Sequence, residues 1–119
     1  MVALYVTASQ EETGKTAICA GLGKHLLDNG KKAGFLKPII GDKKVADGDA
    51  AFIKHILALE EPVDSICPII SSQNNLADEV KQAYDQVSQG KDVVIIEGMP
   101  IEACYEIVEA LNAEVLIVE

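Results

Sequence analysis

The sequence predicts an α/β fold with three layers, in which a parallel β-sheet is covered by helices on both faces. Four apolar runs, at residues 2–7, 33–40, 92–97 and 113–118, alternate along the chain with segments of helical periodicity. Within each run apolar residues follow one another directly, which is typical of strands buried on both faces of a parallel sheet. The regular alternation of strand and helix favours parallel pairing, because each parallel connection needs a crossover.

Four segments with helical spacing separate or follow these strands. They cover residues 15–29, 49–59, 76–88 and 101–111, and Gly30 follows the first of them as a C-terminal cap. Apolar side chains recur at intervals of three and four residues, so one face of each helix is expected to pack on the sheet. The expected inward-facing residues are Ile18, Leu22, Leu26 and Leu27 in the first helix, and Phe52, Ile53, Ile56 and Leu57 in the second.

Two shorter features complete the expected fold. The strand in the segment 33–40 is expected to end at Lys37-Pro38, because Pro38 cannot donate a hydrogen bond to a neighbouring strand. Residues 66–70 are apolar and are expected to form a small strand. The chain finishes on an apolar strand, where a further helix would normally follow. We therefore expect one domain over residues 1–119 that is truncated at its C-terminus, is a minimal version of the fold, or is one half of a larger assembly.

Composition and charge disfavour several classes of function. The 119 residues carry a formal net charge of −9, which disfavours binding to nucleic acid and to anionic membranes. No apolar run reaches the roughly 20 residues of a membrane span, and no signal peptide is recognisable, so a cytoplasmic location is expected. The thiols of Cys19, Cys67 and Cys104 are expected to be buried and structural. His25 and His55 lack partners at metal-ligand spacing and are expected to be structural or surface groups.

The strongest functional signal is Gly14-Lys15-Thr16, between the first strand and the first helix. The P-loop pattern is G-x-x-x-x-G-K-[ST], and Ser9 stands in place of its first glycine. Amides at a helix N-terminus attract phosphate, the lysine reaches the β- and γ-phosphates, and the threonine hydroxyl ligates magnesium. The pattern therefore predicts a Rossmann-like P-loop NTPase domain that binds ATP and Mg2+; the alternative is a helix that happens to begin with these residues. The residues expected to bind the nucleotide are Glu12, Thr13, Gly14, Lys15 and Thr16.

Charged residues also stand at the carboxyl ends of predicted strands, where open parallel sheets bind their ligands. Glu97 ends the most apolar strand and is expected near the metal, the alternative being a solvated carboxylate. Lys37 is expected to meet phosphate oxygens or a carboxylate, the alternative being a surface lysine. Asp49 fits a second metal ligand and a helix cap equally well, and Asp42 and Asp47 are weaker candidates. We expect catalytic roles for Lys15 and Lys37, and metal ligation by Thr16, Asp49 and Glu97.

Together these residues resemble dethiobiotin synthetase, and more closely the dethiobiotin-synthetase-like domains at the front of some phosphotransacetylases. The family loop V-T-G-T-D-T-E-V-G-K-T is similar to residues 6–16, and the family's G-Y-K-P to residues 34–38 with one residue of slack. Its D-A and V-E-G correspond to residues 49–50 and 96–98. The resemblance implies that the two lysines stabilise transferred phosphate while the threonine and the two acids surround magnesium. In the synthetase, ATP phosphorylates a carbamate made from a diamino fatty acid and carbon dioxide, and the carbamate closes to a cyclic urea.

The chain departs from that family on the substrate side. Glu11 replaces a threonine that helps to bind the diamine, Met99-Pro100 replaces glycines, and the family's later strands have no counterpart. We therefore favour a nucleotide-binding or sensing module that regulates an enzyme partner; the alternatives are an active ligase of the synthetase type and a P-loop relic that binds nothing. A partition-type ATPase is disfavoured, since its signature lysine would fall at Gln10. A homodimer is expected, because the final strand leaves an exposed apolar edge.

Overall fold

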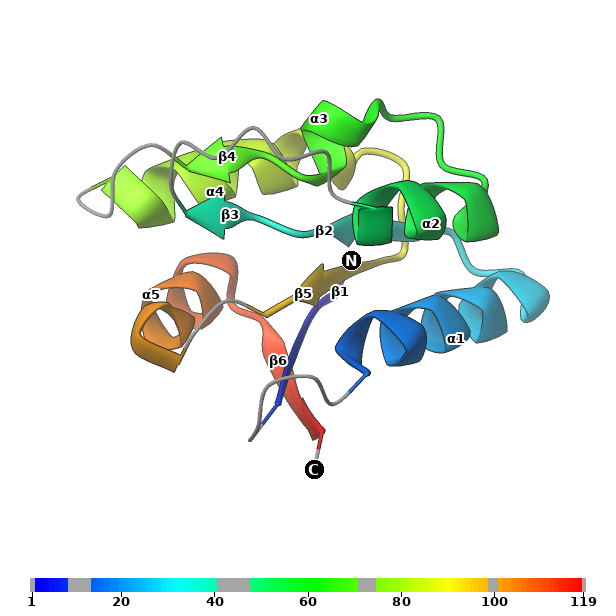
Figure 1. The fold of residues 1–119 in the computed structure, drawn as a ribbon, viewed down its shortest axis with the longest axis horizontal. Helices are drawn as coiled ribbons and strands as arrows, with labels where there is room; N and C mark the ends of the chain where they lie inside the picture. Colours follow the sequence, from blue (N-terminus) through cyan, green and yellow to red (C-terminus); the bar gives the residue numbers. More distant parts are fainter. Residues whose placement is uncertain (1, 9–13, 41–47, 71–74, 99–100, 119) are drawn as a thin grey trace.

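The computed structural model describes residues 2–8, 14–40, 48–70, 75–98 and 101–118. Strands and helices follow one another along these segments (Figure 1). The elements in chain order are β1 (Val2–Ala8), α1 (Lys15–Asp28), β2 (Ala33–Leu36), β3 (Ile39–Ile40), α2 (Gly48–Leu57), α3 (Val63–Ile66), β4 (Ile69–Ile70), α4 (Leu76–Val87), β5 (Val93–Glu97), α5 (Ile101–Leu111) and β6 (Glu114–Val118).

The main sheet has four strands in the order β2-β5-β1-β6, and every neighbouring pair is parallel. The central pair is β5 and β1, in which Tyr5 lies opposite Ile96. Each connection between strands of this sheet passes through at least one helix, as parallel pairing requires. The predicted α/β fold with a parallel sheet is therefore confirmed.

Helices cover both faces of the sheet. α1 and α2 pack against each other on one face, and α4 and α5 pack against each other on the opposite face (Figure 1). None of the helices in the described part of the chain has the length and apolar character needed to cross a membrane.

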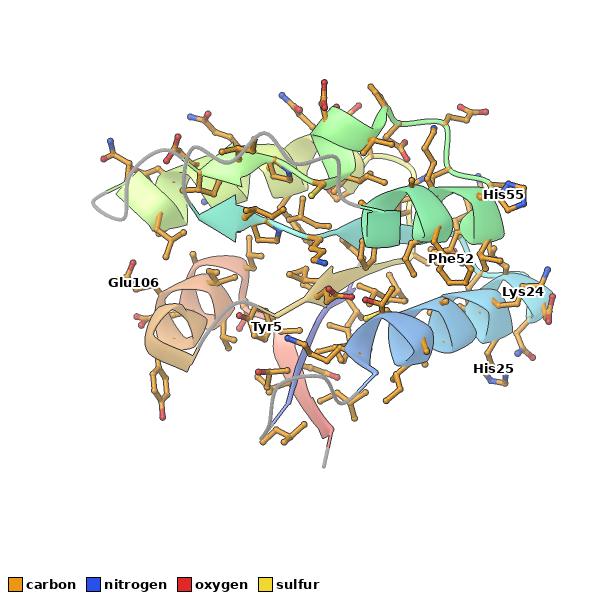
Figure 2. All side chains as sticks on the ribbon, viewed as in Figure 1. Tyr5, Lys24, His25, Phe52, His55 and Glu106 are labelled. Atoms are coloured by element: carbon orange, nitrogen blue, oxygen red, sulfur yellow. The ribbon has the colours of Figure 1, made fainter. Side chains whose placement is uncertain are left out.

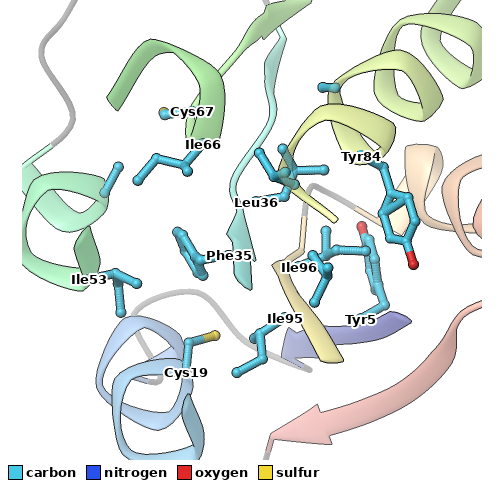
Figure 3. Packing of buried hydrophobic residues seen from close by; sticks show 14 of the residues in the cluster. Tyr5, Cys19, Phe35, Leu36, Ile53, Ile66, Cys67, Tyr84, Ile95 and Ile96 are labelled. Atoms are coloured by element: carbon cyan, nitrogen blue, oxygen red, sulfur yellow. The ribbon is translucent and has the colours of Figure 1, made fainter. Parts of the chain in front are cut away.

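The core fills the space between the sheet and its two helical layers. Figure 3 shows Phe35 on the side of the sheet that carries α1 and α2, and Ile96 toward Tyr84 of α4. This division follows from the alternation of side chains along each strand. The largest fully buried side chains are Tyr5, Phe35, Leu36, Ile53, Ile66, Ile70, Ile95, Ile96, Ile107, Val6, Val80 and Val87.

The segment at 33–40 is divided between two sheets: the first strand ends next to Lys37-Pro38 as predicted, whereas the separate strand at Ile39–Ile40 was not predicted. β2 ends at Leu36, and after Lys37-Pro38 the chain enters β3, which pairs in parallel with β4 in a separate two-stranded sheet. The Lys37 amide donates to the carbonyl of Ile66 at 2.6 Å, and Pro38 has no amide to donate. The proline therefore marks the place where the chain leaves the main sheet.

The small strand predicted at 66–70 is only partly correct. Residues Val63–Ile66 form the short helix α3, and the strand β4 is limited to Ile69–Ile70. Pro62 precedes the helix with a φ of −64°, and its carbonyl accepts a hydrogen bond from the Ser65 amide at 2.9 Å. The available signals were Pro62, whose fixed φ suits a helix start, and Asp64, an acid in the first turn.

The inward faces predicted for the first two helices are largely confirmed, because Ile53 and Leu57 are buried and the partly buried side chains of Leu22, Leu26, Leu27 and Ile56 pack against the core. The fully buried residues of α1 are Cys19, Ala20 and Gly23, whereas its four predicted apolar residues are only partly buried. A Cβ atom added at Gly23 would lie 2.8 Å from the side chain of Leu57, so small residues let α1 and α2 approach closely. Phe52, predicted to face inward, is 49% exposed.

The last strand, β6, lies at the edge of the described sheet and pairs with β1 on one side. Val115, Leu116 and Ile117 are 46%, 39% and 60% exposed. The expectation that this strand is buried on both faces is therefore wrong for the described residues, while the expectation of an exposed apolar edge is confirmed.

The approach of Gly98 to β1 leads to a test of stability. A Cβ atom added at Gly98 would lie 2.6 Å from the Val6 carbonyl oxygen and 3.2 Å from the Cα of Thr7. Because backbone atoms cannot move aside cheaply, Gly98→Ala should lower the free energy of unfolding by about 1–3 kcal/mol. Urea unfolding followed by circular dichroism measures this change.

The matched control for that test is Gly21→Ala. A Cβ atom at Gly21 meets nothing within 4 Å, and alanine in a helix is more stable than glycine by roughly 0.5–1 kcal/mol. Gly21→Ala should therefore raise the stability. If Gly98→Ala were as stable as the wild type, the close contact with β1 would not constrain the fold.

Candidate functional site

Three segments converge at the carboxyl edge of the main sheet, and each brings functional side chains. α1 begins with Lys15 and Thr16, Lys37 directly follows β2, and Glu97 is the last residue of β5. Register explains why two of them meet, since the last residue of β2 pairs with the residue that precedes Glu97. In open parallel sheets this edge is where ligands bind.

Glu97 is the centre of the site. Its side chain is 4% exposed, and its Oε2 lies 3.0 Å from the Nζ of Lys37. Its Oε1 accepts a hydrogen bond of 2.6 Å from the Oγ1 of Thr16. A carboxylate removed from water in this way needs a nearby cation and donors, because its own hydration is lost. Helix α1, strand β5 and the end of β2 are therefore linked through one side chain.

Lys15 reaches the same edge of the sheet by another route. Its Nζ donates a hydrogen bond of 3.3 Å to the carbonyl of Gly98. Gly98 is held in turn by its own amide, which donates to the carbonyl of Val6 at 2.6 Å. The ammonium groups of Lys15 and Lys37 thus both lie at the end of β5.

The contact between Lys15 and Gly98 was missed by reasoning from the sequence. In the sequence, Gly98 stands out only as the last residue of the segment 96–98 that resembles V-E-G. The physical signal available was a glycine placed directly after a strand, which often marks a close approach of another backbone. Only the parallel pairing of β1 with β5 makes that approach visible.

Gly14 sets the direction in which α1 begins. It is the N-cap residue and adopts a left-handed conformation, with φ 79° and ψ 31°. A Cβ atom there would meet nothing within 4 Å, so the backbone conformation, rather than space, favours glycine. Its carbonyl accepts the first helical hydrogen bond from the Ile18 amide at 3.1 Å. The amides of the first turn have no partners within the helix and carry the positive end of its dipole, a combination that attracts anions.

Cys19 lies beneath this group of charges and is fully buried. Burial, and secondly the charge of Glu97, raise the pKa of the Cys19 thiol to about 12, against the opposing effect of Lys15 and Lys37. The thiol is therefore protonated at neutral pH and is not suited to act as a nucleophile. This agrees with the expectation of a structural cysteine.

The remaining predicted residues are placed only in part. Asp49 is the second residue of α2, but its side chain lies outside the described residues, so neither metal ligation nor capping is tested. In the described part of the chain, no group of three or more His, Cys, Asp or Glu side chains could hold a metal ion. Also outside the described residues are Glu12, Thr13, Gln10, Glu11, Asp42, Asp47 and the side chain of Cys104, whereas Cys67 is buried.

The two histidines are remote from the site. Figure 2 shows His25 and His55 on the outer surface, near the ends of α1 and α2. Both are exposed, which confirms the expectation of surface groups. His25 occupies the last turn of α1, whereas Lys15 and Thr16 occupy its first turn.

Comparisons with known proteins identify relatives of the whole described fold. A family model described as an AAA domain matches residues 2–119. The ATP-dependent dethiobiotin synthetase BioD of Caldicellulosiruptor saccharolyticus is 28% identical over 116 residues, which cover 82% of this chain and 48% of the relative. The enzyme of the same name from Brachyspira hyodysenteriae is 27% identical over 110 residues, covering 81% and 50%. The chain thus spans about half the length of these synthetases.

A longer relative and a solved structure extend the comparison. The phosphate acetyltransferase of Haemophilus influenzae is 29% identical over 123 residues, which cover 88% of this chain and 17% of that protein. The C-terminal Sua5 domain of a hypothetical Sua5 protein from Pyrococcus horikoshii superimposes with a TM-score of 0.53 at 18% identity, over 98% of this chain and 95% of that one. The second likeness concerns the fold alone. From the match over residues 2–119 and from these relatives, the chain belongs to the dethiobiotin synthetase-like P-loop family whose model is described as an AAA domain.

Proposed function

We propose that the chain is a nucleotide-binding module that takes Mg2+-ATP, with the triphosphate at the start of α1. The observation that carries this proposal is the meeting of Lys15, Thr16, Lys37 and Glu97 at one edge of the sheet, within hydrogen-bonding distances. Two lysines there supply positive charge for phosphate, and the first turn of α1 supplies backbone donors. Membership of a family that contains ATP-dependent enzymes supports the same ligand.

The donor atoms of the site suit magnesium. Thr16 and Glu97 present a hydroxyl and a carboxylate oxygen 2.6 Å apart, and Mg2+ prefers oxygen ligands supplied by few protein groups together with phosphates and water. When bound, the metal would neutralise phosphate charge. In our proposal Thr16 and Glu97 hold the metal, Asp49 is a further ligand, and Lys15 and Lys37 hold phosphate oxygens. Glu12, Thr13 and Gly14 contribute to the loop around the phosphates.

A binding or sensing role is favoured over a synthetase reaction. Glu11 places an anion at the position where the family has a threonine that helps to bind the diamine. Under this proposal the bound nucleotide turns over very slowly and reports to an enzyme partner.

Calorimetric titration with Mg2+-ATP tests the proposal. Wild-type protein should bind, and Lys15→Ala should bind roughly tenfold or more weakly, because a charge-assisted hydrogen bond to phosphate is lost. Lys24→Ala is the matched control: Lys24 is on the same helix, its side chain is 60% exposed and it pairs only loosely with Asp28 at 3.8 Å. Equal binding by wild type and Lys15→Ala would contradict the proposed phosphate site.

The alternative function is an active ligase of the synthetase type. The presence of both Lys15 and Lys37 at the site favours this alternative. A single-turnover assay with diaminopelargonic acid, bicarbonate and ATP distinguishes the two roles. The sensing role predicts Mg2+-ATP binding without a cyclic urea product. Formation of the cyclic urea within one turnover would establish the ligase, and Lys37→Ala should then abolish the product, with circular dichroism used to check that the variant is folded.

We also propose that the chain forms a homodimer through β6. The strand exposes three apolar residues along an edge, and antiparallel pairing about Leu116 would place Glu114 opposite Val118, so that no two carboxylates meet. Sedimentation velocity should therefore show a dimer at high concentration. Ile117→Lys should shift the protein to monomer, whereas Lys24→Ala should not; a monomeric wild type would reject the interface.

A further inference from the structure

We propose that the ammonium of Lys37 neutralises the Glu97 carboxylate, in place of the metal, whenever no nucleotide is bound. A divalent cation then binds only together with the triphosphate. This inference rests on the proposed function, because it concerns the same site. It adds a condition for binding: the lysine has to move from the carboxylate to the phosphate before the metal can enter. Free divalent cations are then excluded from the site.

The contacts of Glu97 are the first basis for this inference. One carboxylate oxygen lies 3.0 Å from the ammonium of Lys37, and the other accepts the hydrogen bond from Thr16 at 2.6 Å. The two groups expected to ligate the metal, the hydroxyl of Thr16 and the carboxylate of Glu97, therefore both make contacts within the protein. A metal ion approaching Glu97 would meet the positive charge of Lys37 at close range, where repulsion is strong because the surroundings are largely dry.

The burial of Glu97 explains why the lysine remains there. The residue is 3% exposed, and an ionised carboxylate without a counter-charge is very unfavourable in such a place. Lys37 supplies the counter-charge from the neighbouring strand end. The Lys37 ammonium can therefore leave Glu97 only when another cation takes its place at the carboxylate. The metal is the cation that arrives with the nucleotide.

The anchoring of Lys37 shows which part of it can move. Its amide donates to the carbonyl of Ile66 at 2.6 Å, and the next residue, Pro38, is buried, so the backbone is fixed between the two sheets. The side chain is a flexible stem of four carbons and is 20% exposed. The ammonium can therefore swing toward a bound phosphate while the backbone stays in place.

Lys15 differs from Lys37 in this respect. Its ammonium rests on the carbonyl of Gly98 at 3.3 Å, which is a neutral acceptor. When Lys15 turns toward phosphate, it leaves no unpaired charge behind. Of the two lysines that the structure describes at this site, Lys37 is the one that links phosphate binding to the charge of the metal ligand, so the proposed coupling between metal and nucleotide depends on it.

Binding of Mn2+ in the absence of nucleotide tests the inference. Mn2+ takes oxygen ligands as Mg2+ does, and the free ion is measured directly by electron paramagnetic resonance. Wild-type protein should bind it weakly, and Lys37→Met should bind it more tightly by a factor of about 5–150, the usual range for coupling between two sites. Lys37→Arg keeps the positive charge and should bind as weakly as the wild type.

Two controls separate the site from general charge effects. Lys24→Met removes one positive charge at the exposed surface of α1 and should leave Mn2+ binding unchanged. The double variant Lys37→Met with Glu97→Gln removes the ligand as well and should lose the gain. In thermal unfolding, Mn2+ should raise the Tm of Lys37→Met but not that of the wild type, because a ligand stabilises the state that binds it.

The outcomes separate this inference from the proposed function. Unchanged Mn2+ affinity in folded Lys37→Met, or in Lys37→Gln if the methionine variant does not fold, overturns the inference even when the wild type binds Mg2+-ATP. Tight binding of Mn2+ by the wild type without nucleotide also overturns it. A wild type that binds no Mg2+-ATP, tested beside a Lys37→Met variant that gains Mn2+, rejects the proposed function and the link to the triphosphate, and leaves only the exclusion of free divalent cations by Lys37 standing.

Discussion

A carboxylate buried at the edge of a sheet has to be compensated by positive charge or hydrogen-bond donors, and Glu97 imposes this requirement on the molecule. Its two oxygens contact Lys37 at 3.0 Å and Thr16 at 2.6 Å, so β2, β5 and α1 meet at one point. Removing one partner of such a buried pair typically costs about 3–5 kcal/mol. The same arrangement gathers the groups that a phosphate-binding site needs, so stability and binding depend on the same side chains.

The parallel sheet brings the described groups of this site to one edge. Because β1, β2 and β5 run in the same direction, the residues that follow them emerge at one edge. The separation of β2 from β3 at Lys37-Pro38 adds a second feature, since it holds the lysine where the chain changes sheets. Gly98 completes the edge by lying directly against β1.

Much of the fold follows from the sequence. The alternation of apolar runs with helical segments is enough to predict the layers, and Gly14-Lys15-Thr16 is enough to place an anion site at the first helix. Lys37 and Glu97 can be assigned to one sheet edge, but their direct contact cannot, because four apolar runs do not reveal which strands are neighbours. The order β2-β5-β1-β6 decides it. The apolar period of α1 identifies Leu22, Leu26 and Leu27 as core-facing but does not reveal that small residues such as Gly23 are buried most deeply. The exposure of β6 depends on what lies beside the strand rather than on its own residues.

The conformation of Gly14 limits how the turn before α1 can vary. With φ at 79° and open space around the missing Cβ, the restriction concerns handedness and not volume. Any L-residue with a Cβ atom is strained in this conformation, whereas a D-residue adopts it without strain. Chemical synthesis with D-alanine at position 14 would therefore favour the folded conformation of Gly14, because it reduces the conformational freedom of the unfolded chain. None of the genetically encoded L-residues has this effect at a positive φ.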